Sequence, residues 1–240
     1  MIFKRVSDII MFEGEKCSSS TGVYLTFDLD WCHEKVLLDS LDLINKYKAK
    51  ATLFLTNKLN CIDLLLNNPS LELGIHPNFN PLIDGSCNPT DNAEKITDDL
   101  LTLVPNARSI RSHSLATSGR LTAMFSSKGL THESNTKIPF TIPSISPFRH
   151  SSGMIICPLH WSDYSDRNFS FKTITLPNYF MVNFHPIHIF LNTENLDRYE
   201  RTRHLHHKPD KLIKYRYEGE GARTRLLELL KLAEPEPTAK

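Results

Sequence analysis

The stretch VYLTFDLDWCHE, Val23 to Glu34, joins an apolar run to two carboxylates that stand one residue apart. Its Val, Tyr, Leu, Thr and Phe residues favour a buried β-strand, so the sequence predicts a strand over 22–30. On one extended strand Asp28 and Asp30 point to the same side, with Leu29 turned away. The predicted strand therefore ends in a pair of acids, which form either a turn or a functional site.

Helix and strand patterns alternate after this first strand. Apolar residues recur at helical spacing over 33–47, and a shorter helix is predicted over 61–68. Strands are predicted over 50–56 and 71–76, which are rich in β-branched and apolar residues. Alternating strands and helices are typical of parallel βα units, so the sequence predicts an α/β fold with a mostly parallel sheet.

The second half of the chain continues this alternation more loosely. It predicts helices over 92–103, 116–127 and 221–233, and strands over 107–113, 153–161 and 179–186. Residues 131–152 are rich in Pro and Ser and predict irregular structure at the sheet edge. Asp197 to Tyr217 carry seven Lys or Arg and three His, and predict a basic loop. The tail 234–240 is expected to fray.

Length and composition limit the possible classes of protein. A chain of 240 residues predicts one domain over 1–240. The 28 basic and 27 acidic residues give a net charge of +1, which argues against a nucleic-acid partner. No apolar run is long enough to span a bilayer, and charges interrupt the N-terminal region, so we expect a cytoplasmic protein. The five cysteines form no C-x-x-C pair, and no feature specifies an oligomeric state.

Acids and histidines fall where the predicted strands end, at Asp28, Asp30, His76, His113 and His185. Each residue alone has an ordinary structural explanation, since an Asp often caps the next helix and a buried His is often structural. Together they are more informative, because parallel strands bring their carboxyl ends to one edge of the sheet. Carboxylate and imidazole groups suit a divalent metal such as zinc, and the second carboxylate could act as a general base.

Five motifs in this order resemble the polysaccharide deacetylase (NodB-homology, carbohydrate esterase) family, in particular members from O-antigen and other surface-glycan gene clusters. The motifs are LTFDLDW, KATLFLT, LELGIHPNFNPL, RSHS and NFHPIH, and the resemblance covers 22–192. It implies a distorted (β/α) barrel of mostly parallel strands. It also implies metal-dependent removal of an N-acetyl or similar acyl group from an amino sugar or glycan, in surface-polysaccharide biosynthesis.

The resemblance also implies roles for individual residues. Asp28 matches the catalytic base of the family, and Arg111 matches the arginine that holds this base. Asp30 and His76 match metal ligands, and the expected metal is Zn²⁺. His185 matches the general acid that protonates the leaving amine.

The sequence departs from the family pattern at the third metal ligand. The second motif normally ends in a histidine where this chain has Asn80, so the ligand is either Asn80 or His113. We favour His113, because imidazole suits zinc better than a carboxamide does. HWSDY matches the fourth motif more weakly, through Trp161 and Asp163. The predicted substrate-binding residues are therefore Asn80, Trp161, Asp163 and His188.

Two other functions explain part of the pattern. An Asp-x-Asp motif also holds the metal and the nucleotide-sugar phosphates in many glycosyltransferases, but that function leaves the strand-end histidines without a role. The Asn80 replacement also fits a member that has lost its metal and binds glycans without catalysis. Cys32 and His33 do not form a nucleophilic pair, because their spacing prevents mutual contact on an extended strand.

Overall fold

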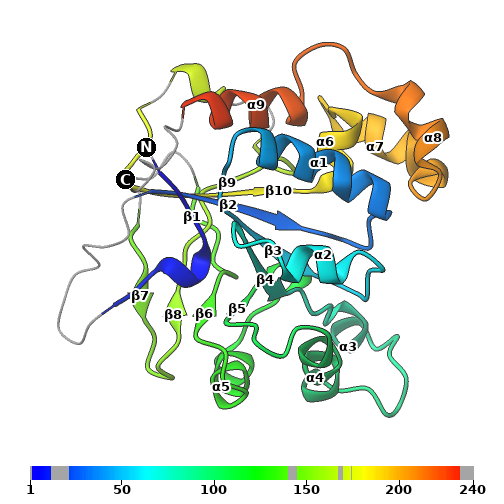
Figure 1. Ribbon diagram of the computed structural model, residues 1–240. Helices are drawn as coiled ribbons and strands as arrows, with labels where there is room; N and C mark the ends of the chain where they lie inside the picture. Colours follow the sequence, from blue (N-terminus) through cyan, green and yellow to red (C-terminus); the bar gives the residue numbers. More distant parts are fainter. Residues whose placement is uncertain (1, 12–21, 140–144, 167–169, 174, 233–240) are drawn as a thin grey trace.

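The computed structural model describes residues 2–11, 22–139, 145–166, 170–173 and 175–232. Within these ranges one curled sheet runs through the molecule, in the order β7-β8-β6-β5-β4-β3-β2-β10-β9, with β1 paired to β2 (Figure 1). The strands are β1 (Phe3–Lys4), β2 (Gly22–Asp28), β3 (Ala51–Leu55), β4 (Leu71–Ile75), β5 (Ser109–Ile110), β6 (His132–Glu133), β7 (Phe148–Arg149), β8 (Ile155–Ile156), β9 (Trp161–Ser162) and β10 (Tyr179–Phe184).

The centre of the sheet is apolar because its strands are covered on both faces. Every residue of β2, β3 and β10 is buried. β10 pairs with β2 in parallel, with Val182 opposite Leu25, although these strands are far apart in the sequence. Among the described strands only the pair β7 and β8 is antiparallel. The predicted α/β fold with a mostly parallel sheet is therefore confirmed, and its curl agrees with the expected distorted barrel.

Helices cover the outside of the curled sheet. They are α1 (Glu34–Lys46), α2 (Ile62–Leu66), α3 (Asn80–Asp84), α4 (Ala93–Leu103), α5 (Gly119–Ser127), α6 (Pro186–Leu191), α7 (Leu196–Thr202), α8 (Pro209–Leu212) and α9 (Ala222–Leu232). Helices α1, α6 and α9 lie together beside β2 and β10 (Figure 1). His33 caps α1, since its Nδ1 accepts a hydrogen bond from the Lys35 backbone N–H at 3.1 Å. No described helix combines the length and apolar character needed to cross a membrane.

Several predicted elements in the second half need correction. The strand predicted over 107–113 is limited to β5, and the strand predicted over 153–161 is divided into β8 and β9. Pro158 lies between these two strands, and a proline has no N–H for the sheet ladder. Within 131–152, β6 lies inside the sheet between β5 and β8, so this segment is not only edge structure. Its residues 140–144 lie outside the described ranges.

The predicted basic loop over 197–217 is also wrong. This segment forms α7, α8 and the short 3-10 turns η5 (Arg203–Leu205) and η6 (Ile213–Tyr215). Leu205 and Leu212 explain the difference, because they pack with α1 and α6 in a small apolar cluster. The charged residues of this segment therefore lie on helices that also have a buried side. The tail 234–240 lies outside the described ranges, and the two-residue strand β1 was not predicted.

Candidate active site

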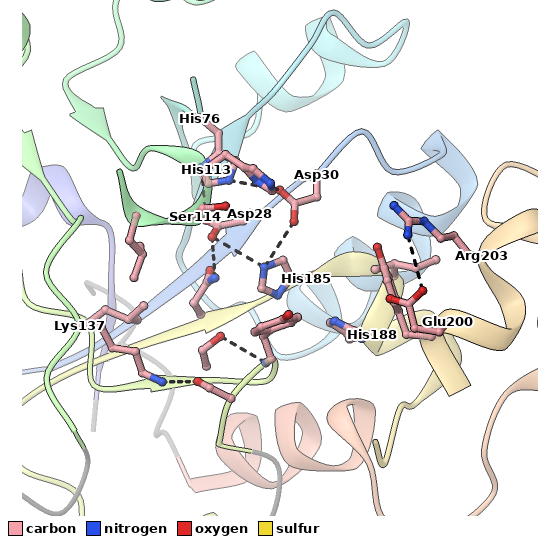
Figure 2. A pocket seen from close by; sticks show the side chains of 18 residues that line it. Asp28, Asp30, His76, His113, Ser114, Lys137, His185, His188, Glu200 and Arg203 are labelled. Atoms are coloured by element: carbon pink, nitrogen blue, oxygen red, sulfur yellow. Dashed lines mark hydrogen bonds and ion pairs between the residues drawn. The ribbon is translucent and has the colours of Figure 1, made fainter. Parts of the chain in front are cut away.

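Polar side chains from five strand ends meet beside one cavity of about 570 Å³ (Figure 2). The residues follow their strands directly or end them: Asp28 on β2, His76 after β4, Arg111 after β5, Asp163 after β9 and His185 after β10. His113 joins them from the short 3-10 turn η3 (His113–Leu115). The sheet is parallel here, so its carboxyl ends bring these residues to one edge as predicted from the sequence.

Asp28 is buried and held by neutral and cationic donors. Arg111 Nη1 donates to Asp28 Oδ1 at 3.0 Å, and Asn183 Nδ2 donates to Asp28 Oδ2 at 2.7 Å. The side chain of Asp28 is 7% exposed. Each carboxylate oxygen has two lone pairs, so Asp28 keeps acceptor capacity on the cavity side. Its position is fixed before any ligand arrives.

Arg111 is completely buried and donates hydrogen bonds to several polar groups of the site. Its Nη1 also donates to Thr26 Oγ1 at 2.8 Å and to Asn183 Oδ1 at 2.7 Å. Nη2 and Nε donate to Ser134, at the hydroxyl and at the backbone carbonyl. A buried charge is tolerated only when it is paired and fully hydrogen-bonded, and this guanidinium meets that condition. Arg111 thus links Asp28 and Thr26 of β2 to Asn183 of β10 and to Ser134, which follows β6.

Asp30 reaches the site through a turn and not through the strand. β2 ends at Asp28, and Asp30 has a φ of 41° in a turn closed by a hydrogen bond from Cys32 N–H to the Leu29 carbonyl at 2.8 Å. The predicted extended strand over 22–30 is therefore too long. Within this turn the Asp30 carboxylate still faces the site, where it lies beside His76 and His113.

Two imidazoles face the Asp30 carboxylate. Asp30 Oδ1 lies 3.2 Å from His76 Nε2 and 3.1 Å from His113 Nδ1. Burial opposes ionisation of Asp30, but hydrogen bonds from His113 and His76 outweigh it and hold the pKa well below its usual range. Asp30 is consequently an ionised carboxylate at neutral pH.

Asp30, His76 and His113 offer a donor set that fits a divalent cation. One ligand atom from each residue lies within 4.8 Å of the others. His76 Nδ1 donates to the Arg111 backbone carbonyl at 2.6 Å, which orients the ring and aims Nε2 at Asp30. To bind a cation, Nε2 would give up its proton and its hydrogen bond to Asp30. One carboxylate and two neutral imidazoles are ligands that zinc commonly takes.

His185 lies on the other side of the two carboxylates. Its Nδ1 donates to Asp163 Oδ1 at 2.6 Å, and its backbone N–H donates to Asp163 Oδ2 at 2.8 Å. Nε2 therefore points toward the cavity, 3.6 Å from Asp30 Oδ2 and 3.9 Å from Asp28 Oδ2. Burial disfavours the charged ring, but the surrounding carboxylates, Asp163 first, raise its pKa to about 9. The ring is protonated at neutral pH and can donate a proton.

Not every predicted site residue faces the cavity. Trp161 is fully buried against Phe171 and Phe184, and its Nε1 donates to the Asp166 carbonyl at 3.1 Å. This corrects the prediction of a substrate contact, because the indole belongs to the core. Asn80 is not among the residues that line the cavity, and its Nδ2 donates to Ser114 Oγ at 3.0 Å.

His188 and Asp163 both contact His185 and hold its ring in place. His188 lines the cavity, is buried, and its ring meets the His185 ring edge-on at 5.5 Å. Its Nδ1 is hydrogen-bonded to Thr193 Oγ1 at 3.0 Å. Asp163, His185 and His188 also come within 4.8 Å of one another, but both oxygens of Asp163 already accept hydrogen bonds from His185. This second group therefore positions His185.

Asn183 is the main contributor that the sequence analysis missed. It bridges Asp28 and Arg111 from the middle of the site. The signal was present, because Asn183 stands two residues before His185 within the strand predicted over 179–186, where alternation places both on the same face. Tyr199 and Arg203 also line the cavity, which places part of the segment predicted as a basic loop at the site.

Comparisons with known proteins bear on this arrangement. A family model described as WbmS-like polysaccharide deacetylase matches residues 25–203. A crystal structure from Bordetella bronchiseptica, described as a candidate polysaccharide deacetylase involved in O-antigen biosynthesis, is 34% identical with a TM-score of 0.87. That match covers 96% of this chain and 97% of the other. No curated protein matches at a significant level.

Two more distant structures also match the chain. A family 4 carbohydrate esterase from Streptomyces lividans, in complex with acetate, is 15% identical with a TM-score of 0.45, over 69% of this chain and 79% of that one. A family 4 pseudoenzyme from Bacillus anthracis is 13% identical with a TM-score of 0.46, over 87% and 66% of the two chains.

Proposed function

The chain belongs to the WbmS-like polysaccharide deacetylase family, and we propose that it is a metal-dependent hydrolase acting in surface-polysaccharide biosynthesis. In this proposal it removes an N-acetyl or similar acyl group from an amino sugar. The B. bronchiseptica protein, described as acting in O-antigen biosynthesis, supports the choice of a glycan substrate. The cytoplasmic location expected from the sequence stays a prediction.

The observation that carries the proposal is the separation of two carboxylates into different environments. Asp28 is held by Arg111 and Asn183, whereas Asp30 faces His76 and His113. A hydrolase of this kind needs one carboxylate to accept a proton and another to bind a cation. The surroundings of Asp28 suit the first task, and those of Asp30 suit the second.

Asp30, His76 and His113 would hold the cation, with Zn²⁺ as the best match to their donor atoms. A bound divalent ion supplies polarisation of the acyl carbonyl and makes a water molecule more acidic. Asp28 lies beside this group, with its Oδ1 3.9 Å from His76 Nδ1. It is therefore positioned to accept a proton from a water molecule in the cavity.

His185 completes the reaction as the general acid. Cleavage of the amide leaves an amine that must gain a proton before it departs. The Nε2–H of His185 points into the cavity, and its pKa of about 9 keeps it protonated at neutral pH. Asp163 holds the ring in the orientation that aims this proton at the substrate.

The other functions are not favoured. A glycosyltransferase would leave the paired roles of His185 and Asp163 unexplained, and the family match argues for a deacetylase. A module without catalysis was suggested by Asn80, but His113 stands beside Asp30 and His76 and can replace the missing histidine. The ligand set therefore remains complete despite the change at Asn80.

The test measures metal content and acetate release on the purified protein. We expect about one divalent ion per chain and acetate release from at least one form of N-acetylated amino sugar, with free, nucleotide-linked and oligosaccharide forms tested in parallel. Asp28→Asn should reduce acetate release by about 100-fold or more, because the general base is lost. Asp210→Asn is the matched control, since Asp210 is an exposed carboxylate that pairs with Lys35. Absence of stoichiometric metal, together with an unchanged Asp28→Asn variant, would show that the proposal is wrong.

A further inference from the structure

Trp31 occupies a backbone conformation that a bulky residue rarely adopts. It is the second central residue of the turn Leu29 to Cys32, with φ of 41° at Asp30 and 54° at Trp31. Positive φ at both central residues defines a type I′ turn, in which Asn and Gly are strongly preferred. A tryptophan is strained there, because its Cβ approaches the following carbonyl oxygen. Asp30 has a role that justifies its place, but the turn itself does not require an indole.

Core packing does not explain the tryptophan either. Trp31 is 41% exposed, whereas the other tryptophan of the chain, Trp161, is fully buried. The indole of Trp31 meets the His113 ring at 5.2 Å in an edge arrangement, and its backbone N–H donates to Thr56 Oγ1 at 3.0 Å. A large apolar group that is strained and only partly buried gains little from folding. Some other contact must account for it.

The position of Trp31 beside the candidate reaction centre indicates which contact. Its chain neighbour Asp30 and its ring neighbour His113 both line the cavity, but Trp31 is not part of that lining. Tyr164, which is 54% exposed, lines the cavity near His185, with ring centroids 6.4 Å apart. Figure 2 shows the carboxylate of Asp30 between His113 and His185. Exposed aromatic rings therefore lie next to both histidines, with Trp31 beside His113 and Tyr164 beside His185.

We propose that Trp31 is a stacking platform for a sugar ring next to the one whose acyl group enters the cavity. The C–H face of a pyranose is apolar and slightly positive, which complements the negative face of an indole. A ring stacked on Trp31 lies outside the cavity, so the substrate class is an oligosaccharide or longer glycan and not a single sugar. This inference rests on the proposed function only for its requirement that a glycan binds at this site.

A purely structural role makes different predictions. If Trp31 only positions His113, its loss should weaken metal binding about 10- to 100-fold, as loss of a group that supports a metal ligand typically does. If it is a glycan platform, the variants Trp31→Ala and Trp31→Gly should keep Zn²⁺ affinity within about threefold of the unaltered protein. Chelator competition measures this without any substrate.

Glycan binding is measured by acrylamide quenching of tryptophan fluorescence. Trp31 is the exposed fluorophore and Trp161 the buried one, so quenching reports on Trp31. A β-1,4-linked N-acetylglucosamine tetramer should protect it, and N-acetylglucosamine alone should not. By calorimetry, Trp31→Ala should weaken tetramer binding about threefold to tenfold, Trp31→Phe should keep most of it, and the control Tyr215→Ala should be unchanged.

Stability provides a second measurement that needs no ligand. Glycine suits the left-handed position, so Trp31→Gly should melt at least as high as the unaltered protein, with a rise of up to about 2–4 °C. A clear fall in its melting temperature, or tetramer binding that survives Trp31→Ala undiminished, would overturn the inference. Tetramer binding that depends on Trp31 without any acetate release would instead refute the proposed hydrolysis and leave the platform intact.

Discussion

The hydrogen bond between Asp163 and His185 leads to a quantitative prediction for Asp163→Asn. This bond joins His185 Nδ1 to Asp163 Oδ1 at 2.6 Å, in a pocket where the Asp163 side chain is 1% exposed. The asparagine keeps the size of the side chain and can still accept one hydrogen bond, but it removes the negative charge. Burial then still disfavours the protonated His185 ring, while one negative charge fewer offsets that effect.

The pKa of His185 sets the size of the expected effect. The rise from 6.5 to about 9 in the folded protein corresponds to roughly 3 kcal/mol in favour of the imidazolium. Asp163 is the largest source of this rise, and Asp30 and Asp28 contribute less. Without the Asp163 charge we expect a pKa near or below 6.5. At pH 7.5 the protonated fraction then falls from nearly all to about one tenth, so the acid-dependent rate drops about tenfold.

The same change has a consequence for stability. Because the folded pKa of His185 is raised, protonation stabilises the fold fully below pH 6.5, and this contribution is lost as the pH rises through about 9. The free energy of unfolding should therefore fall between pH 6.5 and 9 in the unaltered protein. In Asp163→Asn this dependence should largely disappear.

Two measurements check the reasoning about Asp163. An NMR titration of the histidine ring protons, with His185→Gln to assign the signal, gives the pKa directly. Urea unfolding at a series of pH values gives the stability profile. If His185 in Asp163→Asn still titrates near 9, or the slope of stability against pH is unchanged, Asp163 does not set the protonation of the acid.

The remaining predictions concern the metal group and the buried arginine. His113→Ala should lower the affinity for Zn²⁺ at least tenfold, whereas Asn80→Ala should change it little. Chelator competition measures both affinities. The reverse order would mean that Asn80 is the third ligand. Arg111→Lys should destabilise the fold by about 3–5 kcal/mol in urea unfolding, because three ammonium N–H donors cannot serve the five acceptors that surround the guanidinium, on Asp28, Thr26, Asn183 and Ser134. A loss below about 1 kcal/mol would contradict this account.

The regular part of the fold was predictable from local patterns. Long buried strands such as β2 and β10, and amphipathic helices such as α1, carry their periodicity in the sequence. Elements of two residues, such as β5, β6 and β9, carry no such signal, because their pairing depends on neighbours that are distant in the chain. The helices within 197–217 were missed because the prediction rested on the number of charged residues and took no account of the apolar residues Leu205 and Leu212.

The sequence by itself determined which residue types stand at the strand ends, and the parallel arrangement then required them to meet. It therefore supplied Asp28, Asp30, His76, His113 and His185 as one group. The tertiary structure alone decided their separate environments. Asp28 is surrounded by donors, whereas Asp30 enters from a left-handed turn and faces imidazoles. Burial, tautomer and pKa arise from contacts across the sheet, and such contacts have no local pattern that a sequence can display.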